Sequence, residues 1–132
     1  MDAGAPHGIL KVLVVDDNED MATSVVELLS SLGCSAKCAF ERTSALQLFS
    51  EFTPGLVVLD LEMPGADGVE LLSQMRSLLV PKQPKYVCLT GTTDPDAESR
   101  CLLAGFDRFL TKPVTMATLA ELTNQAVGAA PA

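Results

Sequence analysis

Short apolar runs alternate with amphipathic segments along most of the chain, and this alternation predicts the order of the secondary-structure elements. Apolar runs bounded by glycine, proline or charged residues are typical of buried strands. Five such runs are present: Ile9 to Val15, Ser35 to Phe40, Gly55 to Leu59, Tyr86 to Leu89 and Phe106 to Leu110. After each run, apolar residues recur at helical spacing, and we place these helices at residues 21–32, 45–52, 69–79, 95–104 and 114–127. For the fourth helix, Asp94 is the expected N-cap and Pro95 the first helical residue.

Five strands alternating with five helices predict a doubly wound α/β domain built on a parallel five-stranded sheet. The first, third and fourth runs are nearly continuous in apolar residues, as expected of strands that helices cover on both faces. We place one domain at residues 9–127. The flanking segments 1–8 and 128–132 are aperiodic and rich in small residues, so we expect both to be flexible.

Composition and charge narrow the function classes. The 132 residues are 48% hydrophobic and 20% charged, which suits a single folded domain. The net charge is −8 and no run of Lys or Arg occurs, so we expect no direct binding to nucleic acid and none to a membrane surface. Neither a membrane span nor a secretory signal is recognisable, and a cytoplasmic location is the expectation.

The four cysteines do not form a recognisable metal motif. Their spacings match no zinc pattern, and the single histidine, His7, lies in the expected flexible segment. We therefore expect free thiols that act as small hydrophobic residues. The four positions are Cys34, Cys38, Cys88 and Cys101.

The candidate chemistry lies where the predicted strands end. The first strand ends in Asp16-Asp17, the third in Asp60 and the fourth in Thr90, while Lys112 follows the fifth. Because the carboxyl ends of parallel strands share one edge of a sheet, we expect these side chains to form one pocket. Like charges about 4 Å apart repel by roughly 4 kcal/mol at an effective dielectric of 20, so a cation is expected among the acids. Hard carboxylate oxygens favour Mg²⁺.

Each of these residues also has a simpler structural explanation. An acidic pair after a strand often caps a helix, and Asn18 could serve the same purpose. Asp60 could belong to a turn with Pro64 and Gly65, Lys112 could be a solvated surface residue, and Thr90 could merely end a strand. These explanations do not account for the convergence of acids, hydroxyl and ammonium on one edge.

At these positions residues 9–127 resemble the receiver domain of bacterial two-component response regulators. Four motifs carry the resemblance in the same order and strand context: "VLVVDDNED", "LVVLDLEMPGADGVELL", "CLTGTTD" and "AGFDRFLTKPV". The resemblance implies a flavodoxin-like strand order 2-1-3-4-5. It also implies that Asp60 accepts a phosphoryl group.

The resemblance assigns the remaining site residues. The Mg²⁺ ligands would be carboxylates of Asp17 and Asp60 and the backbone carbonyl of Glu62, with Asp16 acting mainly through water. Lys112 would pair with Asp60 and then with the phosphoryl group, and the Lys112-Pro113 bond would be cis. Thr90 would be the switch hydroxyl and Phe109 the switch aromatic residue.

The implied function is a signalling switch that catalyses only its own aspartyl phosphorylation and dephosphorylation. The phosphoryl donor would be a histidine of a sensor kinase or of a histidine phosphotransfer protein. Phosphorylation would shift the face formed by the fourth helix, fifth strand and fifth helix toward an active state. A downstream partner is expected on that face, its identity is open, and we expect a monomer or weak dimer.

Three positions depart from the commonest pattern of the family. Phe109 stands in place of a frequent tyrosine, so no phenolic hydroxyl can report the inward state. Gly91 stands where alanine is common and keeps access to the phosphate open. Glu62 places an acid two residues after the acceptor, and we expect the Glu62→Asn change to alter the dephosphorylation rate.

Three rival functions remain at this point. The fold could act as an interaction module that does not depend on phosphorylation. A Mg²⁺-dependent phosphohydrolase with an aspartyl nucleophile usually has an Asp, and not Glu62, two residues further on. A flavin-binding module has the right topology, but without a metal the three carboxylates would repel its phosphate. On the fourth and fifth helices we expect most of Leu102, Leu103, Met116 and Leu119 to be core.

Overall fold

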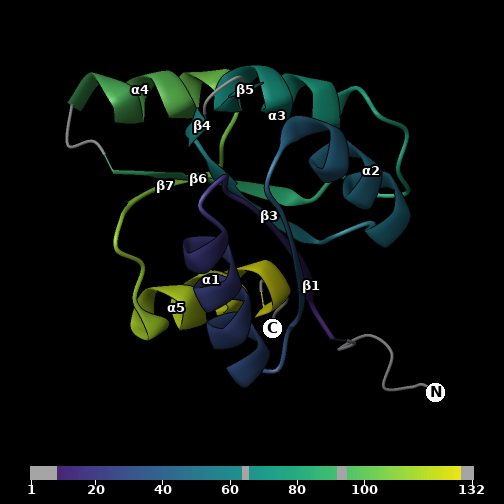
Figure 1. Cartoon of the computed structure of the whole chain (residues 1–132), viewed down its shortest axis with the longest axis vertical. Helices are drawn as coiled ribbons and strands as arrows, with labels where there is room; N and C mark the ends of the chain where they lie inside the picture. Colours follow the sequence, from purple (N-terminus) through teal and green to yellow (C-terminus); the bar gives the residue numbers. More distant parts are fainter. Residues whose placement is uncertain (1–8, 64–65, 92–94, 129–132) are drawn as a thin grey trace.

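A parallel five-stranded sheet forms the centre of the molecule (Figure 1). The computed structural model describes residues 9–63, 66–91 and 95–128. The sheet contains β1 (Lys11–Val15), β2 (Ser35–Ala39), β3 (Leu56–Asp60), β6 (Lys85–Thr90) and β7 (Arg108–Thr111). Its order is β2-β1-β3-β6-β7, so the predicted order of the five main strands is confirmed. Two further short strands, β4 (Glu62–Met63) and β5 (Ala66–Asp67), pair antiparallel with each other outside this sheet.

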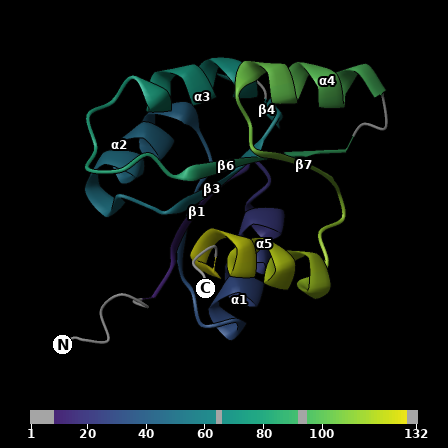
Figure 2. The ribbon, with the colours of Figure 1, turned by 180° about the vertical axis from the view of Figure 1, so that it is seen from behind.

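Helices cover both faces of the sheet, as the continuous apolar strands predict. They are α1 (Glu19–Ser31), α2 (Arg42–Phe52), α3 (Gly68–Arg76), α4 (Pro95–Ala104) and α5 (Met116–Gly128). Figures 1 and 2 show α2, α3 and α4 on one face and α1 with α5 on the other. The doubly wound α/β prediction is confirmed. Among the described residues, no helix combines the length and the hydropathy that a bilayer span requires.

The sheet divides the hydrophobic core into two clusters. Alternate residues of β1 and β3 point to opposite faces, so Leu13 and Val57 pack with α2 to α4 while Val12 and Val58 pack with α1 and α5. All of these strand residues are at most 1% exposed. This burial on both faces holds the tips of β1 and β3 firmly, and the candidate site lies at those tips.

Several predicted boundaries are wrong by a few residues. The third helix ends at Arg76 and not at 79, and Leu79 is fully exposed. Phe106 is buried but lies outside β7, and the last helix begins at Met116 and not at 114. Helix α4 begins at Pro95 as predicted, while the expected cap Asp94 lies outside the described residues, as do Pro64 and Gly65.

The expectation that the apolar positions of the last two helices are mostly core is wrong. Leu119 is completely buried, but Leu103 is 88% exposed, and Leu102 and Met116 are also exposed. Helix α4 packs through Ala97 and Cys101, so Leu102 and Leu103 remain on its outer side, while Met116 is the exposed first residue of α5.

The cysteines are free thiols, as predicted. Cys88 and Cys101 are completely buried, with their Sγ atoms 3.0 Å apart between β6 and α4. Burial raises the pKa of the Cys88 thiol, and the neighbouring Cys101 adds to this effect. Cys34 and Cys38 are half-buried.

Gly68 allows α3 to begin directly behind the tip of β3. A Cβ atom at this position would lie 2.9 Å from Leu61 Cα and 3.1 Å from the Asp60 carbonyl oxygen, so backbone would have to move. We expect Gly68→Ala to lower the free energy of unfolding by about 1–3 kcal/mol, measured by urea denaturation. Gly91→Ala is the matched control, because its Cβ would meet only Glu62 Oε1 at an ordinary 3.8 Å. Equal stability of the two variants would contradict the close approach at Gly68.

Candidate functional site

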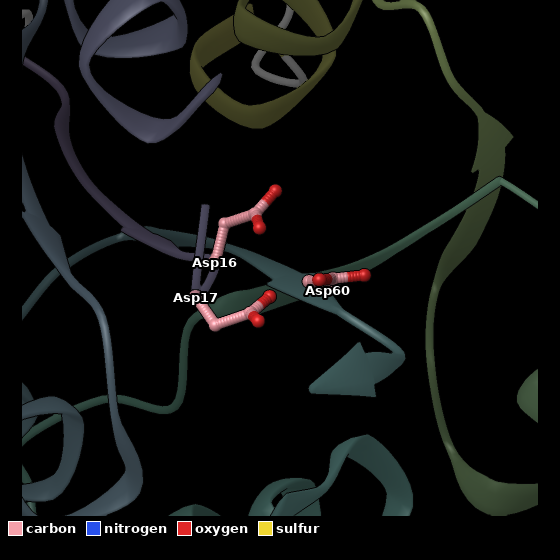
Figure 3. Close-up of side chains that lie close together, drawn as sticks. All are labelled: Asp16, Asp17 and Asp60. Atoms are coloured by element: carbon pink, nitrogen blue, oxygen red, sulfur yellow. The ribbon is translucent and has the colours of Figure 1, made fainter. Parts of the chain in front are cut away.

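Three carboxylates converge at the carboxyl edge of the sheet (Figure 3). Asp16 and Asp17 follow β1, and Asp60 is the last residue of the neighbouring strand β3. One oxygen of each carboxylate lies within 4.8 Å of the others. Asp16 and Asp60 are 1% and 2% exposed, whereas Asp17 is exposed to solvent. The structure therefore brings together the three acids that the strand-end argument selected.

Asn18, and not the acidic pair, caps helix α1. Its side-chain oxygen accepts a hydrogen bond from the Met21 N–H at 3.0 Å. The Asn18 N–H in turn donates to Asp16 Oδ1 at 3.0 Å, which helps to fix the orientation of that carboxylate. Capping therefore does not explain the acidic pair, and the simpler interpretation of Asp16 and Asp17 loses its main support.

Lys112 reaches the acids from the end of β7. Its Nζ lies 3.2 Å from Asp16 Oδ2 and 3.5 Å from Asp60 Oδ1. Burial opposes the charge of Lys112, but the close contact with the Asp16 carboxylate and the negative charges of Asp60 and Asp16 outweigh it and raise the pKa of the ammonium. The backbone N–H of Lys112 also donates to the Thr90 carbonyl oxygen at 2.8 Å. This lysine is therefore a member of the pocket and not a solvated surface residue.

The Asp60 carboxylate is held in an electrostatically unfavourable place. Burial raises its pKa to about 6; the Glu62 backbone N–H and Lys112 oppose this effect, while Asp16 adds to it. The Glu62 N–H donates to Asp60 Oδ1 at 3.2 Å. Without a further cation, ionisation of Asp60 beside two other acids costs free energy.

The Glu62 side chain contacts the tip of the neighbouring strand β6. Its Oε1 accepts a hydrogen bond from the Gly91 N–H at 3.0 Å. That bond, followed by one with the Thr90 side chain, holds the pKa of the Glu62 carboxyl below its usual range. Sequence reasoning placed Glu62 beside the acceptor but missed this contact, for which the only signal was an acid two residues after Asp60.

The remaining predicted residues lie on β6, on β7 and directly after β7. Thr90 is the last residue of β6 and completely buried. Phe109 is half-buried in β7, pairs in register with Cys88 and packs on the core cluster that α2 to α4 cover. The Lys112–Pro113 peptide bond is cis.

The donor set fits a hard divalent cation. Three carboxylates offer oxygens at close range, and Asp16 Oδ2 is buried without a hydrogen-bond partner of suitable geometry, its near neighbour being the Lys112 ammonium. A buried oxygen in this condition gains from a cation. Oxygen-only ligands are those that Mg²⁺ prefers. The backbone carbonyl of Glu62 as a further ligand stays a prediction.

We expect Mg²⁺ to stabilise the protein. At a concentration about 100 times its Kd, a ligand that binds only the folded state raises the unfolding free energy by about 2.7 kcal/mol, or the melting temperature by roughly 10 °C. Asp17→Asn should remove most of this shift in calorimetry. Asp20→Asn, which removes the same charge from an exposed site in the first turn of α1, is the control. Equal Mg²⁺ shifts in both variants would contradict Asp17 as a ligand.

The fold and the site together define the class: a flavodoxin-like α/β domain with an acidic pocket at the carboxyl edge of its sheet. The model of the response regulator receiver domain matches residues 12–124. The chain belongs to this family, the receiver domains of two-component systems.

Two curated relatives and one solved structure illustrate what this chain is similar to. The chain is 34% identical over 123 residues to the sensor histidine kinase AtsR of Burkholderia thailandensis, covering 90% of this chain and 20% of the kinase. It is 32% identical over 116 residues to an uncharacterised 14.6 kDa protein of Leptolyngbya boryana, covering 88% of both. A receiver domain structure from Methylobacillus flagellatus has a TM-score of 0.82 at 30% identity and covers 90% of this chain and 99% of that one. This chain thus spans about one fifth of the kinase relative.

Proposed function

We propose that this receiver domain accepts a phosphoryl group on Asp60 from a phosphohistidine of a sensor kinase or histidine phosphotransfer protein. The observation that carries the proposal is the buried Asp60 carboxylate at a strand tip, within 3.5 Å of the Lys112 ammonium and clustered with two further acids. The similarity of this chain to part of proteins named sensor histidine kinases supports a histidine donor.

The reaction is a displacement at phosphorus. An Asp60 oxygen forms the new O–P bond while the N–P bond of the phosphohistidine breaks and its electron pair remains on the imidazole. Bound Mg²⁺, held by the Asp17 and Asp60 carboxylates with Asp16 acting mainly through water, would supply positive charge against the phosphoryl oxygens. Lys112 meets the same developing charge from the β7 side. Hydrolysis of the acyl phosphate by water returns the carboxylate. In this proposal the domain catalyses only its own phosphorylation and dephosphorylation.

The proposed output is a population shift at the face that contains α4, β7 and α5. The modified Asp60 would carry about −1.5 to −2 charges, which Lys112 and the Thr90 hydroxyl would meet. Movement of Thr90 toward the phosphoryl group would make room for Phe109, whose half-buried ring would exchange between two positions. Exposed Leu102, Leu103 and Met116 give this face apolar contact area for a downstream partner.

Labelling with a small phosphodonor tests the function. The chain is incubated with acetyl phosphate and Mg²⁺, and intact-mass spectrometry reports the gain of one phosphoryl group. Beryllofluoride with Mg²⁺ should shift the backbone resonances of Asp60, Thr90, Gly91 and Lys112 in NMR spectra. Neither a mass gain nor a Mg²⁺-dependent spectral change would favour an interaction module that works without phosphorylation, whereas multiple-turnover phosphatase activity would favour a hydrolase.

A further inference from the structure

The Glu62 carboxylate lies on hydrogen-bond donors at the mouth of the pocket. Its Oε1 accepts from the Gly91 N–H at 3.0 Å, and the Thr90 side chain hydrogen-bonds to the same carboxylate. The positive charge of Lys112 also favours the ionised form of Glu62. The Glu62 carboxylate is therefore stabilised by the Gly91 amide, the Thr90 hydroxyl and the positive charge of Lys112.

The same donors face the place where a phosphoryl group on Asp60 would lie. Asp60 pairs in register with Leu89, so Thr90 and Gly91 continue β6 just beyond the acceptor carboxylate. The Leu61 N–H donates to the Leu89 carbonyl oxygen at 2.9 Å, which fixes the two strand tips beside each other. Lys112, which follows β7, also contacts the Asp60 carboxylate. Phosphoryl oxygens on Asp60 would thus need the groups that Glu62 now holds.

We propose that Glu62 is an internal competitor, whose carboxylate occupies the Thr90 and Gly91 donors in the unphosphorylated protein and is displaced when Asp60 is phosphorylated. This inference rests on the proposed function and adds a regulatory element to it. Displacement is feasible because Glu62 is an exposed side chain that can turn into solvent. Repulsion between Glu62 and a doubly charged phosphoryl group would keep it there.

The competition weakens phosphoryl binding by the free energy of the hydrogen bonds that Glu62 loses when it leaves Gly91 and Thr90. Hydrogen bonds to a charged group contribute more than neutral ones, but solvent exposure reduces the value here. Removal of the carboxylate should therefore raise the affinity for a phosphoryl mimic about threefold to tenfold. Return of Glu62 to Gly91 and Thr90 after hydrolysis would restore the contacts at the tip of β6.

Beryllofluoride titration tests this competition without turnover. The full-length chain, at saturating Mg²⁺, is titrated by NMR in the wild-type form and as Glu62→Ala. Glu98→Gln is the control, because it removes an exposed acidic charge from the first turn of nearby α4 and no described contact joins it to Gly91. We expect a threefold to tenfold lower Kd for Glu62→Ala and less than a twofold change for the control. Before titration, the Gly91 amide proton of Glu62→Ala should lie upfield of its wild-type position.

The outcomes separate the two proposals. Equal affinities of the wild type and Glu62→Ala, or an equal gain in Glu98→Gln, would overturn the competition and leave phosphorylation of Asp60 intact. An unchanged Gly91 resonance in Glu62→Ala would also overturn it. Absence of beryllofluoride binding in every variant would instead refute the proposed function.

Discussion

Replacement of Asp60 by asparagine is expected to abolish phosphoryl labelling while the protein stays folded. The amide has no carboxylate oxygen for attack on phosphorus, although its size is nearly the same. The pKa of Asp60 is raised to about 6, above its unfolded value near 4, so the ionised form lowers stability as the pH rises through that window. At pH 7 the variant should be more stable than the metal-free wild type, on the order of 1–3 kcal/mol.

Two measurements decide this prediction. Intact-mass spectrometry after incubation with acetyl phosphate and Mg²⁺ reports labelling, and urea denaturation in metal-free buffer reports stability. Asp16 and Asp17 remain in the pocket, so they test whether a neighbouring carboxylate takes over. Asp20→Asn should label like the wild type. Labelling that persists on another residue of Asp60→Asn would refute the assignment of the acceptor.

Replacement of Lys112 by methionine is expected to slow labelling by acetyl phosphate on the order of 10²-fold, as found when one donor to a developing oxyanion is lost. The methionine retains the apolar stem but leaves the buried Asp16 and Asp60 carboxylates without their cation. Breaking a buried pair in this way costs about 3 kcal/mol of stability in metal-free buffer, and Mg²⁺ should restore part of it. Mg²⁺ binding itself should survive, because the acids are unchanged.

The Lys112 variant also tests how the site communicates with β7. Beryllofluoride should still perturb Asp60 in NMR spectra, but the resonances of Phe109 and of α4 should move less than in the wild type. Lys85→Met, at the opposite end of β6, removes the same charge and should change neither rate nor coupling. A wild-type labelling rate with full movement of Phe109 would rule out the role of Lys112.

The elements that position the site were predictable because strand burial and strand ends are encoded locally. The run Leu56 to Leu59 is apolar throughout and is followed by an acid, and a parallel sheet places such ends together. The end of the third helix was not predictable from the same pattern. Leu79 continues the helical spacing, yet the helix has already ended at Arg76 and Leu79 is fully exposed.

The contact of Glu62 with Gly91 shows a different limit. It joins residues 29 positions apart in sequence. Its existence depends on how close the tips of β3 and β6 lie and on which way one exposed side chain turns. No periodicity or motif carries that information. The exposed Leu102 and Leu103 show the same limit for burial, since apolar spacing on a short helix does not reveal which side lacks a neighbour.

The division of the core by the sheet has a consequence for how this domain tolerates change. Phe109 and α4 belong to one half, while α1 and α5 pack their apolar side chains in the other. A conservative substitution such as Val25→Ile therefore changes the side-chain packing only in the half of the core that does not contain Phe109. Stability can be adjusted in that half while Phe109 and α4 keep their own packing, so robustness can be changed separately from the surroundings of the proposed switch residue.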